Sequence, residues 1–176
     1  SNNIGVALAA HPDGKGYWAL DWRGRVWAYG SATDYGEAVI SDPYVGSLNQ
    51  EPKTQAIDIV STYTGNGYWV VYTNGIVRGF GDATNYTTGS YTQIPTTQVA
   101  SFMDVYLRNN YQTGRYLPYL TRLKSVAIGS HPKKIGFWVT DGSGQVWSYG
   151  ACSHRGQLHH RVYNKGMSNS FRLEPL

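Results

Sequence analysis

The stretch GYWVVYTNGIVRGFG at residues 67–81 decides the fold of this 176-residue chain, because it recurs twice with its key residues intact. The equivalent stretches read GYWALDWRGRVWAYG at 16–30 and GFWVTDGSGQVWSYG at 136–150. The alignment extends without gaps over 6–36, 57–87 and 126–156, as expected of a repeat architecture. Five columns are identical in all copies: Gly16/Gly67/Gly136, Trp18/Trp69/Trp138, Gly24/Gly75/Gly144, Val26/Val77/Val146 and Gly30/Gly81/Gly150.

Each copy predicts a set of short antiparallel strands. In the first strand, Val6 and Leu8 stand two residues apart, as do their counterparts in the other copies, so we expect them on one face directed toward the core. The second strand, beginning Tyr17-Trp18, is apolar on both faces, which is typical of a strand covered on both sides.

The glycine columns mark where the chain turns. The pairs Arg23-Gly24, Asn74-Gly75 and Ser143-Gly144 predict two-residue type I′ hairpins that join the second and third strands. The third strand then alternates small and aromatic side chains, which favours close approach of one neighbouring sheet and filling of the space beside the other. A fourth, weaker strand or a loop is expected around Tyr35 and Tyr86.

The repeats predict a single all-β domain over 1–176, built as three propeller-like four-stranded blades at about 4–48, 55–98 and 123–160. An insert at 101–122 and a C-terminal tail at 161–176 stand outside the repeat. Closed propellers have about four to eight blades, so we expect three blades to form an incomplete β-propeller that is completed by oligomerisation or by a partner. The alternative is a β-trefoil, which also has three repeats and closes alone.

The pattern Gly-Tyr-Trp, turn glycine, Val, aromatic, Gly at 67–81 resembles the Gly-Tyr-Trp β-propeller repeats of actinobacterial surface proteins and of their phages. The third copy, 125–158, is also similar to repeats of the regulator-of-chromosome-condensation propellers, which makes an intracellular exchange factor a minor third hypothesis. The resemblance covers about two thirds of the chain. It implies blade architecture more directly than function, because propellers serve many functions.

Charge and composition argue against several classes of function. Fifteen basic and eleven acidic residues give a formal net charge of +4, and the basic residues are scattered, so no nucleic-acid surface is predicted. The sequence contains no apolar run long enough to span a membrane and no secretion signal, and its Ser1 start suits a cytoplasmic product that has lost its initiator Met or a processed mature form. Asp21 and Asp141 share a repeat column beside the turn, which indicates a turn role. We expect no enzyme activity and no cofactor. His154, His159 and His160 are conceivable metal ligands, but adjacent histidines in a strand point to opposite faces, so no metal site is predicted.

Two sets of residues are candidates for binding. The insert interleaves tyrosines and arginines of the kind enriched in protein interfaces, and the predicted partner-binding residues are Tyr106, Arg108, Tyr111, Arg115, Tyr116 and Tyr119. Trp27 and Trp147, which occupy one repeat column with Arg78, are candidate glycan platforms.

Together with the resemblance, these features predict a non-enzymatic structural or binding protein of a bacteriophage tail or tail tip, present in the virion and acting in tail assembly or host-surface attachment. Its expected partners are other tail proteins or copies of itself, with cell-surface glycan as a further ligand. The alternative is a secreted, extracellular carbohydrate-binding lectin of the β-propeller type.

Overall fold

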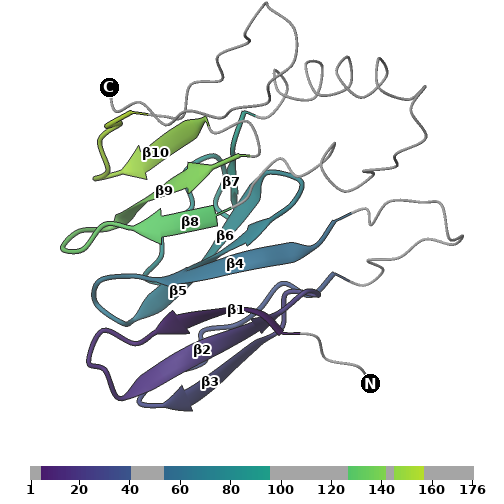
Figure 1. Cartoon of the computed structure of the whole chain (residues 1–176), viewed down its shortest axis with the longest axis vertical. Helices are drawn as coiled ribbons and strands as arrows, with labels where there is room; N and C mark the ends of the chain where they lie inside the picture. Colours follow the sequence, from purple (N-terminus) through teal and green to yellow (C-terminus); the bar gives the residue numbers. More distant parts are fainter. Residues whose placement is uncertain (1–4, 41–53, 96–126, 142–144, 157–176) are drawn as a thin grey trace, which may run out of the picture.

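The fold is a stack of three antiparallel β-sheets in chain order (Figure 1). A computed structural model describes residues 5–40, 54–95, 127–141 and 145–156, and these contain ten strands and no helix. Each sheet corresponds to one sequence repeat, so the prediction of an all-β chain with three propeller-like blades is confirmed.

The strands follow one another within each blade. Blade 1 comprises β1 (Gly5–Ala10), β2 (Gly16–Asp21) and β3 (Val26–Gly30); blade 2 comprises β4 (Ala56–Ser61), β5 (Gly67–Tyr72), β6 (Ile76–Gly81) and β7 (Thr92–Gln93); blade 3 comprises β8 (Ala127–Ser130), β9 (Gly136–Thr140) and β10 (Val146–Gly150). In every blade the second strand lies between the first and the third. The sheets stay separate and form no closed barrel among the described residues, so a β-trefoil does not describe this part of the chain.

The predicted fourth strand forms in blade 2 alone among the described residues, and there it lies at Thr92–Gln93 and not around Tyr86. In blade 1, the segment after β3 forms no strand, and Glu37 Oε2 accepts the Val26 N–H at 2.9 Å. Val77 is the blade 2 residue at this position, and there it pairs with Thr92 of β7. The Glu37 carboxylate thus satisfies in blade 1 an edge position that a fourth strand covers in blade 2. Further along the edge of β6, Asn85 Oδ1 accepts the Gly79 N–H at 2.8 Å.

The hairpins differ from the predicted two-residue type I′ turns. The Gly24 N–H donates to the Asp21 carbonyl, and the Asp21 N–H donates to the Arg25 carbonyl, so the loop holds three residues and ends in a glycine with φ of 88°. Asp21 Oδ1 stabilises this loop by accepting the N–H groups of Arg23 at 2.9 Å and Arg25 at 2.8 Å. Gly75, with φ of 85°, closes the corresponding loop in blade 2.

The invariant tryptophans fasten each blade to the chain that follows its third strand. The indole Nε1 of Trp18 donates to the Thr33 carbonyl at 2.7 Å, and Trp69 makes the equivalent bond to Thr84 at 2.9 Å. Trp138 repeats the bond to Ser153 at 2.8 Å. The acceptor lies fifteen residues after the tryptophan in all three copies, which explains why the Trp column tolerates no other residue type in this chain.

The blades pack face to face. We call the side of a blade directed toward the preceding blade its front face, and the opposite side its back face. The alternation in the third strand has the predicted effect, because the small side chains lie on back faces and the aromatic ones on front faces. The core between blades 1 and 2 contains Trp18, Leu20 and Val26 opposite Ile59, Tyr68 and Val70; the core between blades 2 and 3 contains Trp69, Val71 and Val77 opposite Phe137 and Val139.

Candidate functional site

The front face of blade 1 is the most exposed apolar surface that the structure describes. Its residues come from three paired strands, with Leu8 opposite Ala19 and Ala19 opposite Trp27, followed by Tyr17 opposite Tyr29. Tyr17 and Tyr29 stack with ring centroids 5.0 Å apart and are 40% and 48% exposed. We call the set Leu8, Ala10, Tyr17, Ala19, Trp27 and Tyr29 the open front face.

The repeat shows how unusual this exposure is within the chain. Ile59 is the blade 2 counterpart of Leu8 and is 3% exposed because blade 1 covers it, whereas Leu8 is 61% exposed. Tyr68, the counterpart of Tyr17, is fully buried. The prediction that Val6 and Leu8 share one core-facing side is therefore wrong. A register irregularity lies between Gly5 and Ala7, and its counterpart in blade 2 places Ile57 against the core between blades 2 and 3 while Ile59 packs between blades 1 and 2. In blade 1 both Val6 and Leu8 are exposed.

The back face of blade 3 is the corresponding surface at the other end of the stack. Trp138 lies there half-buried, and His131 stacks on its ring with centroids 5.9 Å apart and an interplanar angle of 17°. In the inner blades the equivalent tryptophans, Trp18 and Trp69, are fully buried by the following blade. We call the set Ala127, Gly129, Trp138, Thr140, Val146 and Ser148 the open back face.

The structure places the two candidate glycan platforms in different surroundings. Trp147 packs against the core between blades 2 and 3, while Trp27 lies half-buried on the open front face. Arg78, at the third position of the column, lies between blades 1 and 2 with its guanidinium 5.9 Å from the Tyr91 ring centroid. The repeat column of Trp27, Arg78 and Trp147 thus lies on the front faces of the blades. Glycan binding by Trp27 and Trp147 stays a prediction.

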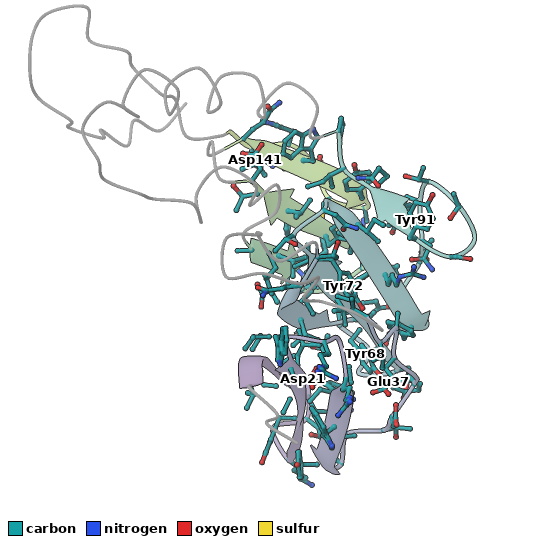
Figure 2. All side chains as sticks on the ribbon, turned by 90° about the vertical axis from the view of Figure 1, so that its right-hand side faces the viewer. Asp21, Glu37, Tyr68, Tyr72, Tyr91 and Asp141 are labelled. Atoms are coloured by element: carbon teal, nitrogen blue, oxygen red, sulfur yellow. The ribbon has the colours of Figure 1, made fainter. Side chains whose placement is uncertain are left out.

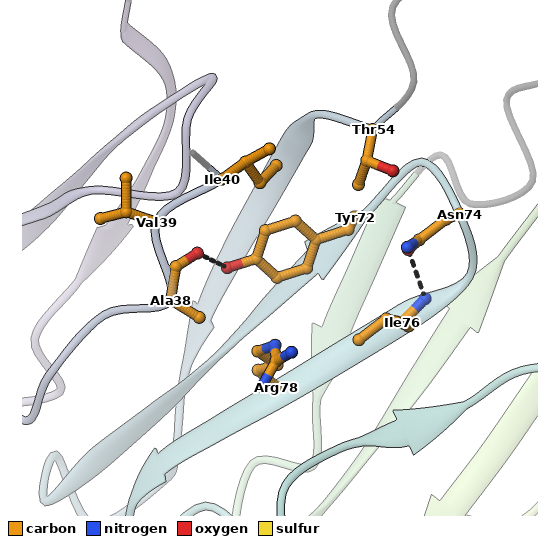
Figure 3. Close-up of a pocket in the computed structure, with 8 residues that line it drawn as sticks. All are labelled: Ala38, Val39, Ile40, Thr54, Tyr72, Asn74, Ile76 and Arg78. Atoms are coloured by element: carbon orange, nitrogen blue, oxygen red, sulfur yellow. Dashed lines mark hydrogen bonds between the residues drawn. The ribbon is translucent and has the colours of Figure 1, made fainter. Parts of the chain in front are cut away.

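A small pocket of about 220 Å³ opens between blades 1 and 2 (Figure 3). Tyr72 forms its wall and donates its hydroxyl to the Ala38 carbonyl at 2.9 Å, which ties the chain after blade 1 to blade 2. Burial raises the pKa of Tyr72, so this hydroxyl stays protonated and keeps donating at neutral pH. Asn74 and Arg78 supply polar groups at the pocket, and Ile40 and Ile76 supply apolar ones. Sequence reasoning missed this pocket because its residues come from two repeats and form no motif.

The two buried aspartates of the described blades do not form a catalytic pair. Asp21 and Asp141 are both buried, but they lie in blades 1 and 3, far apart in Figure 2. Each uses Oδ1 to accept backbone N–H groups of its own hairpin, as Asp141 does from Gln145 at 3.0 Å. The predicted turn role of these residues is confirmed. Tyr68 also has its pKa raised by burial, and it donates its hydroxyl to the Gly36 carbonyl across the blade boundary.

Several predicted residues lie outside the described part of the chain. They include all six partner-binding residues of the insert (Tyr106, Arg108, Tyr111, Arg115, Tyr116 and Tyr119) and two of the histidines considered for a metal (His159 and His160). The residues that the structure does describe contain no group of three metal-ligating side chains. They also contain no helix long and apolar enough to cross a bilayer.

Comparison with known proteins yields a distant structural likeness. No family model matches the chain, and no curated protein matches it. A solved structure provisionally assigned as a 6-phosphogluconolactonase from Bacteroides uniformis superposes with a TM-score of 0.39 and 15% identity over 80% of this chain. The match covers 34% of that protein, so this chain spans about a third of its length.

Proposed function

We propose that this chain is a non-enzymatic structural and binding protein of a bacteriophage tail or tail tip, and that it contributes to tail assembly or host-surface attachment. The observation that supports the binding role is the open front face, where Leu8, Tyr17 and Tyr29 are exposed although their counterparts in blade 2 pack against a neighbouring blade. Contiguous apolar surface of this kind marks a contact site. The tail setting is supported by the resemblance of 67–81 to the Gly-Tyr-Trp repeats.

The polar groups of the described blades support a non-enzymatic role. Asp21 and Asp141 are occupied in stabilising hairpins, and Asp82 accepts hydrogen bonds from Thr62 at 2.8 Å and from Thr64. A nucleophile, base and orienting group in one cleft would be needed for hydrolysis, and the described side chains show no such set.

Immunogold electron microscopy of particles from the phage that encodes the chain tests this function. Antibody against the chain is expected to label one end of the tail, where attachment proteins act. A gene flanked by tail-assembly or lysis genes is expected as well. Purified particles without the chain, together with recovery of the chain from the medium of uninfected bacteria, would contradict the proposal.

A lectin is the second candidate function, and the pocket between blades 1 and 2 favours it. Tyr72, Asn74 and Arg78 place an aromatic ring, an amide and a guanidinium around one small cavity. At the equivalent positions blade 3 carries Asp141 and Trp147, so the pocket chemistry is not repeated. A glycan array with wild type and Arg78→Ala tests this candidate: specific binding that the variant loses supports a lectin, and an array without specific binding eliminates it.

A further inference from the structure

We propose that the partner of the open front face is the open back face of a second copy of this chain, so that two chains complete each other head to tail as a six-bladed ring. This inference rests on the proposed binding role of the open front face and names its partner. Each chain carries both surfaces, one at each end of the stack (Figure 1).

The internal contacts show what each surface is built to meet. In both described blade contacts, a back face with a small residue in its third strand, Ala28 or Gly79, faces a front face with an aromatic residue there, Phe80 or Tyr149. A Cβ on Gly79 would meet the Ala83 carbonyl, so this strand has no space for a larger side chain. The open ends keep the same pairing, because Ser148 lies on the open back face and Tyr29 on the open front face.

The tryptophan column gives a second match. Trp18 on the back of blade 1 contacts Tyr68 on the front of blade 2, with ring centroids 5.4 Å apart. Trp69 contacts Phe137 in the same way at 5.3 Å. At the open ends the corresponding residues are Trp138 and Tyr17, both of which stay accessible. Docking would bury this ring pair, and aromatic pairs contribute about 0.5–1.5 kcal/mol beyond the area that they bury.

A third match involves the loop between the first and second strands. His11 of blade 1 packs against Gly65 of blade 2 so closely that a Cβ on Gly65 would lie 2.5 Å from His11 Nε2. Blade 3 carries His131 in the position of His11, and blade 1 carries Gly14 in the position of Gly65. Gly14 has a φ of +72° and nothing within 4 Å of its Cβ position, so the space that a second copy's His131 requires is free.

One position differs between the internal and the proposed contacts. Tyr35 reaches from blade 1 to blade 2, where its hydroxyl donates to the Gly65 carbonyl at 3.4 Å. Tyr86 makes a similar bond to the Ile135 carbonyl at 3.5 Å, one repeat position further along the loop of blade 3. Blade 3 has Arg155 in this position, exposed to solvent. A guanidinium is also a donor, so it can bond the Gly14 carbonyl of the second copy.

The contact joins two different surfaces, so it generates a ring only if the rotation between blades closes. Two chains of three blades give six, within the range of about four to eight at which propellers close. Closure would cover both open faces of each chain and leave no blade face exposed.

Thiol cross-linking tests the pairing. Across the contact between blades 1 and 2, the His11 side chain lies directly at the Cβ position of Gly65. The corresponding residues at the open ends are His131 of one copy and Gly14 of the other. We would treat Gly14→Cys, His131→Cys and their coexpressed mixture with a short bifunctional maleimide, in a Cys152→Ser background that removes the one native cysteine. The mixture is expected to give a covalent dimer on a denaturing gel, and each variant alone is expected to give none.

The matched control is the double variant His11→Cys with Gly65→Cys, which the reagent should bridge within one chain and so shows that the geometry of these positions permits the link. If this control closes and the mixture stays uncrosslinked, the head-to-tail contact is refuted. Cross-linking of Gly14→Cys with itself would also refute it, because that result indicates front-to-front association. Chain that labels the phage tail but fails to cross-link in the mixture would refute this inference and leave the proposed function standing.

Discussion

Replacing Ile59 by alanine tests the packing between blades, because Leu8 provides a matched position in the same repeat column. Ile59 is 3% exposed and belongs to the core between blades 1 and 2, whereas Leu8 is 61% exposed. Ile59→Ala removes apolar groups equivalent to about three methylenes at about 0.8 kcal/mol each, which gives about 2.4 kcal/mol. The cavity left behind adds to this, so we expect a loss of about 3 kcal/mol in the free energy of unfolding, within the usual range of about 2–5 kcal/mol.

Leu8→Ala should lower the free energy of unfolding by less than about 0.5 kcal/mol in chains diluted to the monomer, because the Leu8 side chain is mostly exposed to water there. At higher concentration the loss from Leu8→Ala should grow, since association stabilises the folded state by mass action. The loss from Ile59→Ala should exceed that of Leu8→Ala at every dilution.

Urea unfolding followed by tryptophan fluorescence measures both variants, and the six tryptophans of the chain report on all three blades. The comparison requires the m-value to stay constant, so that a shift in midpoint reports stability. A loss below about 1 kcal/mol for Ile59→Ala, where about 2–5 kcal/mol is usual, would refute the packing of blade 2 on blade 1. So would equal losses for Ile59→Ala and Leu8→Ala at the highest dilution.

Three further predictions concern single contacts. Trp69→Phe should lower the free energy of unfolding by more than about 1 kcal/mol, because it leaves the Thr84 carbonyl without its indole donor. Trp138→Phe should lower it less, because Trp138 is more exposed to water, and the urea midpoints of the two variants test this difference. Gly81→Ala should lower the free energy of unfolding by about 1–3 kcal/mol, because φ is +66° and the new Cβ would collide with the Asn66 carbonyl. A Cβ at Gly89 meets nothing within 4 Å, so Gly89→Ala should change the melting temperature little. Comparable falls in melting temperature for the two variants would contradict the close approach at Gly81. The backbone N–H of Lys15 and side-chain hydrogen bonds lower the pKa of Asp13 from its ordinary 3.8 to about 2. The stability that the ionised Asp13 adds is therefore present above about pH 4 and disappears as the pH falls through about 2. Wild type and Asp13→Asn should therefore differ in urea midpoint at pH 7 and converge near pH 2, and a difference independent of pH would contradict this.

Much of the blade architecture is predictable from the repeat, because each invariant residue has a local structural function. The Gly16 and Gly30 columns face each other in register between the second and third strands, where a Cβ on Gly16 would lie 2.5 Å from the Tyr29 carbonyl. The tryptophan column depends on a bond to a carbonyl fifteen residues later within the same repeat. Such constraints recur in each copy and therefore appear in the sequence as identical columns.

Features that depend on a neighbour or on one side chain are not predictable in this way. Leu8 and Ile59 have the same local pattern, and their burial differs because blade 2 has a preceding blade in the described structure and blade 1 does not. The three-residue hairpin forms in place of the predicted two-residue turn, and different side chains stabilise it in different blades. Asp21 accepts two N–H groups of the loop in blade 1, whereas Asn74 accepts the Ile76 N–H in blade 2. The pocket beside Tyr72 forms only when the chain after blade 1 packs on blade 2.

The association state in solution tests the central claim most directly, namely that three blades leave two complementary faces open. Sedimentation velocity at micromolar concentration is expected to give a species of twice the chain mass for wild type. Leu8→Asp places a charge in the centre of the open front face and should give the single-chain mass with circular dichroism unchanged, because Leu8 is exposed within one chain. Wild type that remains a stable, soluble monomer at micromolar concentration, or Leu8→Asp that sediments as wild type does, would contradict the account.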